Sequence, residues 1–466
     1  MPTTRRPNII LITTDQQRSD TLGCNGNSWI RTPNIDALAA RGVNFQRAFV
    51  QNTICIPSRA CIQTGRYIHQ HGLTYMENTI DDTPGLPAWE ITFMERLQTA
   101  GYHTGAFGKL HMMPHKGFHE MQVCGGKGAR WTKSAGLEIG LGPLGRDYAA
   151  WLEAKNPGAY ERIYEQRRGP EYKKYRTAIS NILKPDEYVD YWCAQNTIDF
   201  IERDHGKPFF AWCGFCGPHD PMDPPKPYDT VYPHDNMWVP ENAFYNRDGS
   251  KADIAPEQLA MIRRYSSHYH GQITFIDEQI GRVVEALRKR KLFDDTLIIV
   301  TSDHGEMLWE FGRTAKCLFY EAVIRVPLIV VPPGGAPRPA ATTGVVEVFD
   351  IAPTVLDYAS CEVPRIMAAR SLRGMIERGE KGKEFAISMF FDEKRAARGV
   401  CVRSERFTYG QWTQSGSRGL FVDEFFDLQK DPFERHNAIN DPAYREEIER
   451  HKHMLINRML ETMPTM

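Results

Sequence analysis

Two short apolar segments, far apart in the chain, each lead into an acidic residue that is followed by a second polar residue. Residues 8–14 precede Asp15 and Gln16, and residues 296–302 precede Asp303 and His304. Such segments are typical of buried strands, and functional side chains of open α/β sheets gather at the carboxyl ends of strands. The two pairs are therefore candidate ligands for one divalent cation, although two unrelated strand ends explain them equally well at this point.

Strands and helices alternate through most of the length, which predicts an α/β fold. We expect a large, mostly parallel mixed sheet flanked by helices on both faces. Further strands are expected at residues 102–107, 209–215 and 326–331, and helices at 33–42, 91–100, 186–204 and 266–289. Residues 112–185 have weak periodicity, so we expect them to form excursions over the site.

The pattern changes near residue 371, where alternating stretches replace the strand–helix alternation. Residues 386–391 and 400–409 alternate as half-buried strands do, and residues 442–460 form a closing helix. We therefore predict a catalytic α/β domain at 1–370 and a smaller C-terminal α+β subdomain at 371–466, with a small antiparallel sheet and that helix.

Composition and charge exclude several classes of protein. The net charge of −1 predicts no nucleic-acid partner and no anionic membrane surface as a partner. The apolar run at residues 9–12 is too short for a signal peptide, and no run approaches the roughly 18 apolar residues of a membrane helix. We expect a cytoplasmic protein with no membrane association; a homo-oligomer stays open.

Ten cysteines in a chain of 466 residues do not predict a disulfide framework. Most lie in apolar surroundings and are expected to be reduced core thiols. Cys213 and Cys216 form a CxxC pair, which can indicate a redox or zinc site. No second CxxC accompanies it, so we favour a structural role.

The segment CIPSRACIQTGR at residues 55–66 has a different character. It places the Cys55 thiol at the start of a predicted helix, with the fixed positive charge of Arg59 nearby. The N–H groups at a helix N-terminus can bind an anion. A metal, an arginine and a helix N-terminus together suit an oxyanion substrate.

This segment resembles the signature of the type I sulfatases, which belong to the alkaline phosphatase superfamily, with Gln63 where leucine is usual. Other family elements have counterparts here in the same order. They are residues 8–16, TPNID at 32–36, GKLH at 108–111, PHDP at 218–221, SDHGE at 302–306, Lys316, and the segment 426–434. The resemblance spans nearly the whole chain and implies an alkaline phosphatase-like fold and a sulfuric ester hydrolase that cleaves a sugar or aryl sulfate monoester.

The resemblance also implies a modified residue and a metal. A formylglycine-generating maturation enzyme would oxidise Cys55 to Cα-formylglycine, whose hydrate supplies the nucleophile. One divalent ion would be held by Asp15, Gln16, Asp303, His304 and the modified Cys55. Ca²⁺ is the expected ion; Mn²⁺, Mg²⁺ and Zn²⁺ are alternatives because Gln16 and His304 replace the usual aspartate and asparagine.

Catalytic roles follow from the same resemblance. Arg59 would stabilise the alkoxide and Lys109 the sulfate charge. His111 would act as the base that expels sulfate, while His219 and Lys316 would serve the leaving oxygen. Weaker candidates for substrate contacts are His71, Asn78 and Trp309.

Two alternatives remain open from the sequence. The Asp-Gln and Asp-His pairs also resemble phosphonate monoester hydrolases, which cleave phosphorus diesters, but those enzymes tend to lack the counterparts of Lys109 and His111. A non-catalytic binding protein with a vestigial site is the second alternative, and the full set of polar residues argues against it.

Overall fold

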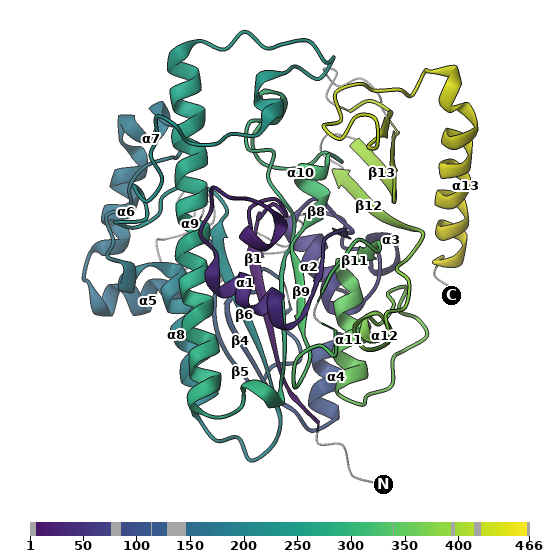
Figure 1. Cartoon of the computed structure of the whole chain (residues 1–466). Helices are drawn as coiled ribbons and strands as arrows, with labels where there is room; N and C mark the ends of the chain where they lie inside the picture. Colours follow the sequence, from purple (N-terminus) through teal and green to yellow (C-terminus); the bar gives the residue numbers. More distant parts are fainter. Residues whose placement is uncertain are drawn as a thin grey trace.

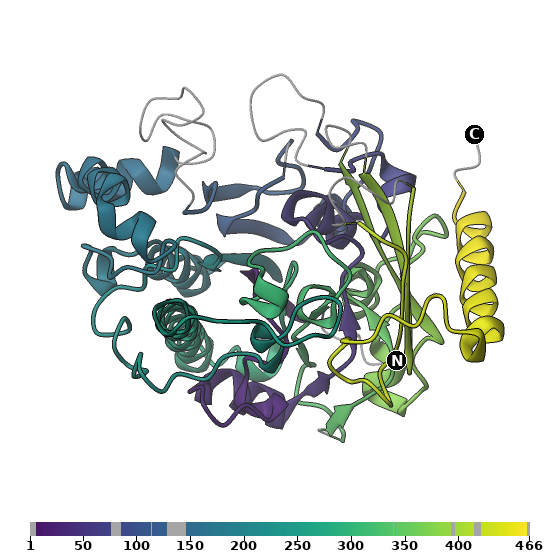
Figure 2. The same ribbon diagram turned by 90° about the horizontal axis from the view of Figure 1, so that it is seen from above.

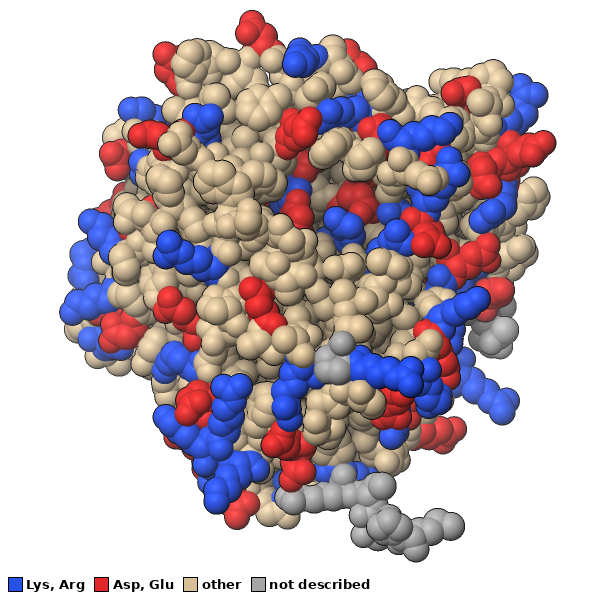
Figure 3. All heavy atoms as spheres, in the orientation of Figure 1, with Lys and Arg blue, Asp and Glu red and all other residues tan. Residues whose placement is uncertain are grey.

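The structure is a computed structural model that describes residues 6–75, 85–112, 114–127, 146–338, 340–392, 397–413 and 421–463. Asn78 lies outside the described residues. Within them, no helix is both long enough and apolar enough to cross a membrane. Lysines and arginines are interspersed with acidic residues over the face drawn in Figure 3, in keeping with the near-zero net charge.

An eight-stranded sheet forms the centre of the molecule (Figure 1), with the strand order β10-β2-β9-β7-β1-β6-β4-β5. The strands are β1 (Asn8–Asp15), β2 (Val43–Phe45), β4 (His103–Lys109), β5 (Glu120–Cys124), β6 (Phe209–Pro218), β7 (Thr296–Ser302), β9 (Leu328–Val331) and β10 (Ala340–Thr342). The central strands β7, β1, β6, β4 and β5 run parallel, whereas β9 is antiparallel to both β7 and β2. The predicted α/β fold with a mostly parallel mixed sheet is confirmed.

Alternation along β1 explains why this strand is apolar on both faces. Ile9 and Leu11 pack into one hydrophobic core, and Ile10 and Ile12 pack into the other. Successive side chains of a strand point to opposite faces, so a strand covered on both sides must be apolar throughout. The sequence of β1 therefore requires helices on both faces of the sheet.

Helices cover both faces. One face is covered by α1 (Pro33–Arg41), α8 (Val189–Glu202) and α9 (Pro256–Lys289), and the other by α2 (Cys55–Thr64), α4 (Phe93–Thr99) and α11 (Ile351–Tyr358). Further helices in the described part of the chain are α3 (Ile68–His71), α5 (Arg146–Lys155), α6 (Ala159–Arg168), α7 (Pro170–Lys174), α10 (Glu321–Ile324) and α12 (Arg373–Arg378).

Two features differ from the sequence-based expectation. Helix α9 begins ten residues before the predicted start at residue 266, because its first turns are largely solvent-exposed and lack the apolar spacing of the rest. Residues 146–174, for which no helix was predicted, form α5, α6 and α7. Their charged and tyrosine-rich faces concealed the helical periodicity.

The C-terminal part forms a four-stranded antiparallel sheet, as predicted. It consists of β12 (Phe385–Asp392), β13 (Ala397–Ser404), β14 (Phe407–Trp412) and β15 (Glu424–Asp427), and α13 (Arg445–Glu461) packs on it (Figure 2). The predicted single stretch at 400–409 is two strands, because the chain turns at residues 405–406. A third sheet joins β3 (Ala48–Phe49), β8 (Arg325–Val326) and β11 (Val346–Glu347). The domain boundary at residue 370 stays a prediction.

Candidate active site

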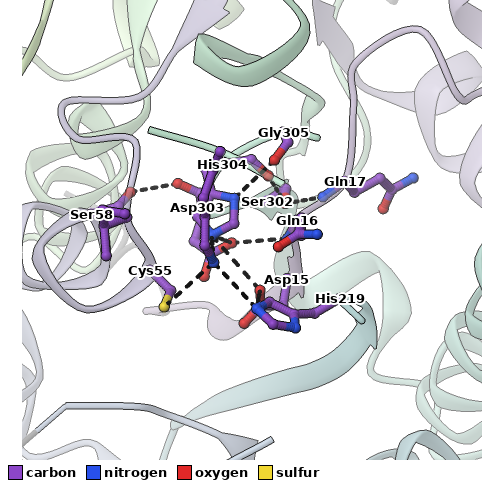
Figure 4. A network of polar contacts seen from close by, with 12 residues as sticks. Asp15, Gln16, Gln17, Cys55, Ser58, His219, Ser302, Asp303, His304 and Gly305 are labelled. Atoms are coloured by element: carbon purple, nitrogen blue, oxygen red, sulfur yellow. Dashed lines mark hydrogen bonds and ion pairs between the residues drawn. The ribbon is translucent and has the colours of Figure 1, made fainter. Parts of the chain in front are cut away.

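The ends of β1 and β7 meet, as the sequence predicts. Thr14 pairs with Ser302 at the last position of the parallel ladder, so the residues that follow lie side by side. Asp15, Asp303 and His304 are completely buried, and their ligand atoms lie within 4.8 Å of one another (Figure 4). The Nε2 atom of His304 lies 3.8 Å from Oδ1 of Asp15 and 3.7 Å from Oδ1 of Asp303.

Helix α2 brings the cysteine motif to this cluster. Cys55 is the first residue of the helix and is buried. The hydroxyl of Ser58 donates a hydrogen bond of 2.6 Å to the backbone oxygen of Asp303, which joins the first turn of α2 to the end of β7. The amide of Asn52 fixes the approach, since its Oδ1 accepts from the N–H of Ile54 at 2.8 Å.

Arg59 lies behind the two carboxylates. Its Nε donates to Oδ2 of Asp303 at 2.7 Å, one Nη donates to the backbone oxygen of Lys109 at 2.7 Å, and the other lies 3.4 Å from Oδ2 of Asp15. Burial alone would lower the pKa of Arg59, but Asp303 and Asp15 raise it, so the guanidinium keeps its charge. Arg59 therefore orients both carboxylates.

Lys109, the last residue of β4, forms a buried ion pair with Oδ2 of Asp15. Burial would raise the pKa of Asp15, but the positive charge of Lys109, with those of Lys316 and Arg59, holds it well below its ordinary value. Both members of this pair are therefore ionised at neutral pH.

Several polar atoms in the cluster are suited to a cation. Within the described part of the chain, Oδ1 of Asp15 and Oε1 of Gln16 are buried without a hydrogen-bond partner. Buried polar atoms are almost always paired, so two orphaned oxygens beside each other in sequence indicate a ligand. The Nδ1 atom of His304 is 2.9 Å from the backbone oxygen of Gly305, to which it donates, so the lone pair lies on Nε2. This donor set fits a divalent metal ion.

Gln16 is held in place by Glu306. The amide nitrogen of Gln16 donates to Oε2 of Glu306, while the backbone N–H of Gln16 donates to Oδ1 of Asp303 at 3.1 Å. Gln16 adopts a left-handed backbone conformation with φ of 68°, which is uncommon for a residue with a side chain. Sequence reasoning did not assign Glu306 or Ser58 to the site, although Glu306 follows Asp303 by three residues and Ser58 lies within the cysteine motif.

Lys316 lies between the metal cluster and the cysteine. Its Nζ atom is 2.8 Å from Nε2 of His304, 3.2 Å from Nε2 of His219 and 3.8 Å from Sγ of Cys55. Burial raises the pKa of the Cys55 thiol, but the positive charges of Lys316 and Lys109 outweigh it and lower that pKa to about 7. The position of Cys55 therefore favours a negatively charged atom.

His219 and His111 are both neutral at physiological pH. Burial and then the charge of Lys316 lower the pKa of His219 to about 3. Nδ1 of His219 lies 2.8 Å from the backbone oxygen of Asp220, so its Nε2 accepts from Lys316. Burial and the charge of Lys109 hold the pKa of His111 well below its ordinary value. A neutral imidazole can accept a proton, as the expected role of His111 requires.

Two weaker candidates lie apart from these contacts. His71 is buried behind α2, where its Nε2 is 3.4 Å from Sγ of Cys61 and its Nδ1 accepts from the N–H of Leu73 at 3.2 Å. Both ring nitrogens are occupied, so the placement of His71 favours a structural role. Trp309 is also buried, with its ring edge against Tyr265.

The buried, charged cluster at the ends of the parallel strands is a candidate metal site of an α/β enzyme, and comparison with known proteins gives the family. The family model described as Sulfatase matches residues 7–361, and the model described as N-sulphoglucosamine sulphohydrolase, C-terminal, matches residues 309–461. The chain belongs to the sulfatase family of hydrolases, which confirms the expectation from the cysteine motif.

The arylsulfatase of Clostridium perfringens (strain 13 / Type A) is 30% identical over 471 residues, which cover 97% of this chain and 94% of that protein. The fold is also similar to that of a protein solved in complex with its substrate D-glucosamine-2-N,6-O-disulfate, with a TM-score of 0.77, 21% identity and coverage of 98% of both chains. The phosphonate monoester hydrolase of Agrobacterium radiobacter has a TM-score of 0.80 and 22% identity, with 98% of this chain and 96% of that chain covered.

Proposed function

We propose that this chain hydrolyses a sugar or aryl sulfate monoester at the cluster around Cys55. A single observation carries the proposal. Cys55, at the start of α2, lies 3.8 Å from Lys316, and Lys316 in turn contacts His304 of the candidate metal cluster and His219. Residues from three distant parts of the sequence thereby meet in one buried, charged site.

The metal ligands in this proposal are Asp15, Gln16, Asp303, His304 and the modified Cys55. Their oxygen-rich donor set suits Ca²⁺, and the imidazole of His304 leaves Mn²⁺, Mg²⁺ and Zn²⁺ as alternatives. When bound, such an ion polarises the oxygens of the ester and favours the ionised form of the nucleophile. Arg59 keeps the carboxylates of Asp15 and Asp303 in position for it.

Cys55 is the proposed target of a formylglycine-generating maturation enzyme. That enzyme oxidises the Cβ of Cys55 from the thiol to the aldehyde, and the hydrate of the aldehyde supplies the attacking oxygen. The two lysines near Cys55 stabilise negative charge at this position, as the lowered pKa of the thiol to about 7 indicates.

The remaining residues divide the work of charge stabilisation and proton transfer. The positive charges of Lys109 and Lys316 both act on Cys55, and their ammonium groups attract the ester oxyanion. Lys316 donates to Nε2 of His219 and lies 3.8 Å from Sγ of Cys55, so it can supply the proton that the leaving oxygen needs, while Nε2 of His304 is kept for the metal ion. Neutral His111 accepts the proton released when sulfate is expelled.

The test is a comparison of turnover by metal-loaded, formylglycine-containing protein on 4-nitrophenyl sulfate and on sulfated monosaccharides. Hydrolysis of either class supports the proposal. A kcat/KM at background for every sulfate ester, in protein whose Cys55 is converted, would refute it and would return attention to a binding role.

A phosphonate monoester or phosphodiester hydrolase is the second candidate. The observation that favours it is the ligand set, since Gln16 and His304 stand where many sulfatases have a second acidic residue and an asparagine. Lys109 and His111, both buried beside the cluster, favour the sulfatase. The two candidates are separated by the kcat/KM values for 4-nitrophenyl sulfate and for a 4-nitrophenyl phosphonate monoester. A higher value for the sulfate supports the sulfatase, and a higher value for the phosphonate supports the second candidate.

A further inference from the structure

A second cluster of reactive side chains lies outside the proposed active site. The thiols of Cys124, Cys193 and Cys216 come from β5, α8 and β6, and all three are buried. Their sulfur atoms lie within 4.8 Å of one another, and the Cys124 and Cys216 sulfurs are 3.2 Å apart. The CxxC pair is therefore divided, since Cys216 belongs to this cluster while Cys213 does not.

The backbone around the cluster is held by close contacts. A Cβ atom on Gly108 would lie 2.5 Å from Sγ of Cys193, so only glycine allows this sulfur to approach β4. Oδ1 of Asp190 accepts from the N–H groups of Cys216 and Gly217 at 2.6 and 3.2 Å, which fixes the segment that carries Cys216. The three thiols are thus positioned before any ligand arrives.

We propose that Cys124, Cys193 and Cys216 form a binding site for a soft metal ion, and that Cu(I) is the ion that fits it. Thiolate sulfurs bind metals at about 2.3 Å, which separates the sulfurs around one ion by about 4 Å. The distances in the cluster, from 3.2 Å to at most 4.8 Å, bracket that separation. Small rotations of the side chains therefore suffice to enclose an ion.

The donor set selects the ion. Among the described residues, the cluster contains no carboxylate and no histidine beside its three cysteines. Thiolates favour Cu(I), whereas Ca²⁺ and Mg²⁺ require oxygen ligands, so this site and the Asp15 cluster take different ions. Zn²⁺ prefers four ligands in structural sites, and three sulfurs suit Cu(I) better.

Protons must leave the thiols when the ion binds. Hydrogen bonds from the thiols of Cys193 and Cys216 hold the pKa of Cys124 well below its ordinary value. Burial and the hydrogen bond to Cys124 raise the pKa values of Cys193 and Cys216 well above theirs, so these two thiols give up their protons to the ion. Binding of Cu(I) displaces thiol protons to solvent and changes no oxidation state.

The test uses the full chain, reduced and free of oxygen, with Cu(I) supplied against a chromophoric Cu(I) chelator. We expect one equivalent of copper to be retained, with a copper X-ray absorption spectrum that contains a shell of three sulfur atoms. Cys193→Ser should weaken the affinity at least about tenfold. Cys213→Ser is the matched control, because Cys213 is equally buried on the same strand as Cys216, and its affinity should equal that of the wild type.

The proposal is overturned if Cys193→Ser and Cys213→Ser bind copper equally, since the ion would then reside at other thiols. Nitrogen or oxygen neighbours in the wild-type X-ray absorption spectrum would overturn it too. Circular dichroism checks that each variant is folded. If Cys193→Ser is unfolded, Cys124→Ser replaces it, because Cys124 lies on the edge strand β5 of the sheet. Copper binding by Cys124→Ser equal to that of Cys213→Ser then overturns the proposal, as do nitrogen or oxygen neighbours in the wild-type spectrum.

Discussion

Replacing Lys109 by methionine tests the electrostatics of the proposed active site most directly. Methionine keeps most of the length and the apolar stem of lysine while removing its charge. Lys109 is 2% exposed and forms an ion pair with Asp15, so ions from the solvent cannot take over the role of its charge in the variant. Arg59 and Lys316 keep their positive charges in the variant. The variant therefore loses one electrostatic stabiliser of the transition state and retains the others.

The expected loss of activity is about 10²-fold in kcat/KM, which corresponds to about 2.7 kcal/mol of transition-state stabilisation. Stability should fall by about 3 kcal/mol, at the low end for a broken buried ion pair, because Arg59 still lies 3.4 Å from Asp15. Metal affinity should not fall, since Asp15 becomes less neutralised. Saturating metal therefore leaves the loss of activity in place.

The assay is 4-nitrophenyl sulfate hydrolysis, with rates divided by the fraction of formylglycine in each sample. Lys383→Met is the matched control. Lys383 is a largely buried lysine whose side chain is 10% exposed, paired with Glu347 and Asp350 at 2.7 and 2.6 Å, and its loss should lower stability without altering kcat/KM. A Lys109→Met enzyme within threefold of the wild type would refute an electrostatic role for Lys109.

Three further predictions concern the nucleophile, the metal and acid stability. In protein matured in a competent host, mass spectrometry should find the peptide 55–66 about 18 Da lighter than the unmodified thiol form. Cys55→Ala should abolish turnover and leave the circular dichroism spectrum unchanged. Wild-type rates in that variant would contradict the mechanism. Removing the metal ion with a chelator should abolish turnover and lower Tm, because the buried oxygens of Asp15 and Gln16 then lose the ion that they bind. Added Ca²⁺ should restore both. A Tm that does not respond to the chelator would contradict a metal at this site. Hydrogen bonds from Arg406 lower the pKa of Asp427 from 3.8 to about 2. The stabilising contribution of this pair is therefore complete above pH 3.8 and is lost as the pH falls through 2. Asp427→Asn should flatten the dependence of Tm on pH over that range, and an unaltered dependence would exclude this pair as its cause.

Much of the sheet could be predicted because burial on both faces leaves a continuous apolar signal. The strands β1, β6 and β7 were all identified from such runs, and their ends located Asp15 and Asp303. The antiparallel direction of β9 carried no such signal, since a buried strand reads the same in either direction. The half-exposed helices at 146–174 were missed for the opposite reason, because only a few of their residues, such as Tyr148, Leu152 and Ile163, pack into the core and the apolar stripe is short.

Sites made by long-range contacts divide in the same way. Residues with a distinctive motif, such as Cys55 and Arg59, could be assigned from the sequence. Glu306 could not, because its contribution is a hydrogen bond to Gln16, far away in the chain. The cluster of Cys124, Cys193 and Cys216 could not be predicted from the sequence either, since the three cysteines come from β5, α8 and β6 and no motif spacing links them.

The charges of the proposed active site decide which substrate comparison is informative. Asp15 and Asp303 have lowered pKa values and are ionised, and they face the cations of Arg59, Lys109 and Lys316. With a divalent ion added, the centre is strongly positive and attracts any singly charged ester. A sulfate monoester and a phosphonate monoester carry the same single charge, so attraction cannot separate them. The ratio of their kcat/KM values at equal leaving group therefore measures how well Lys109 and Lys316 match the geometry of each transition state.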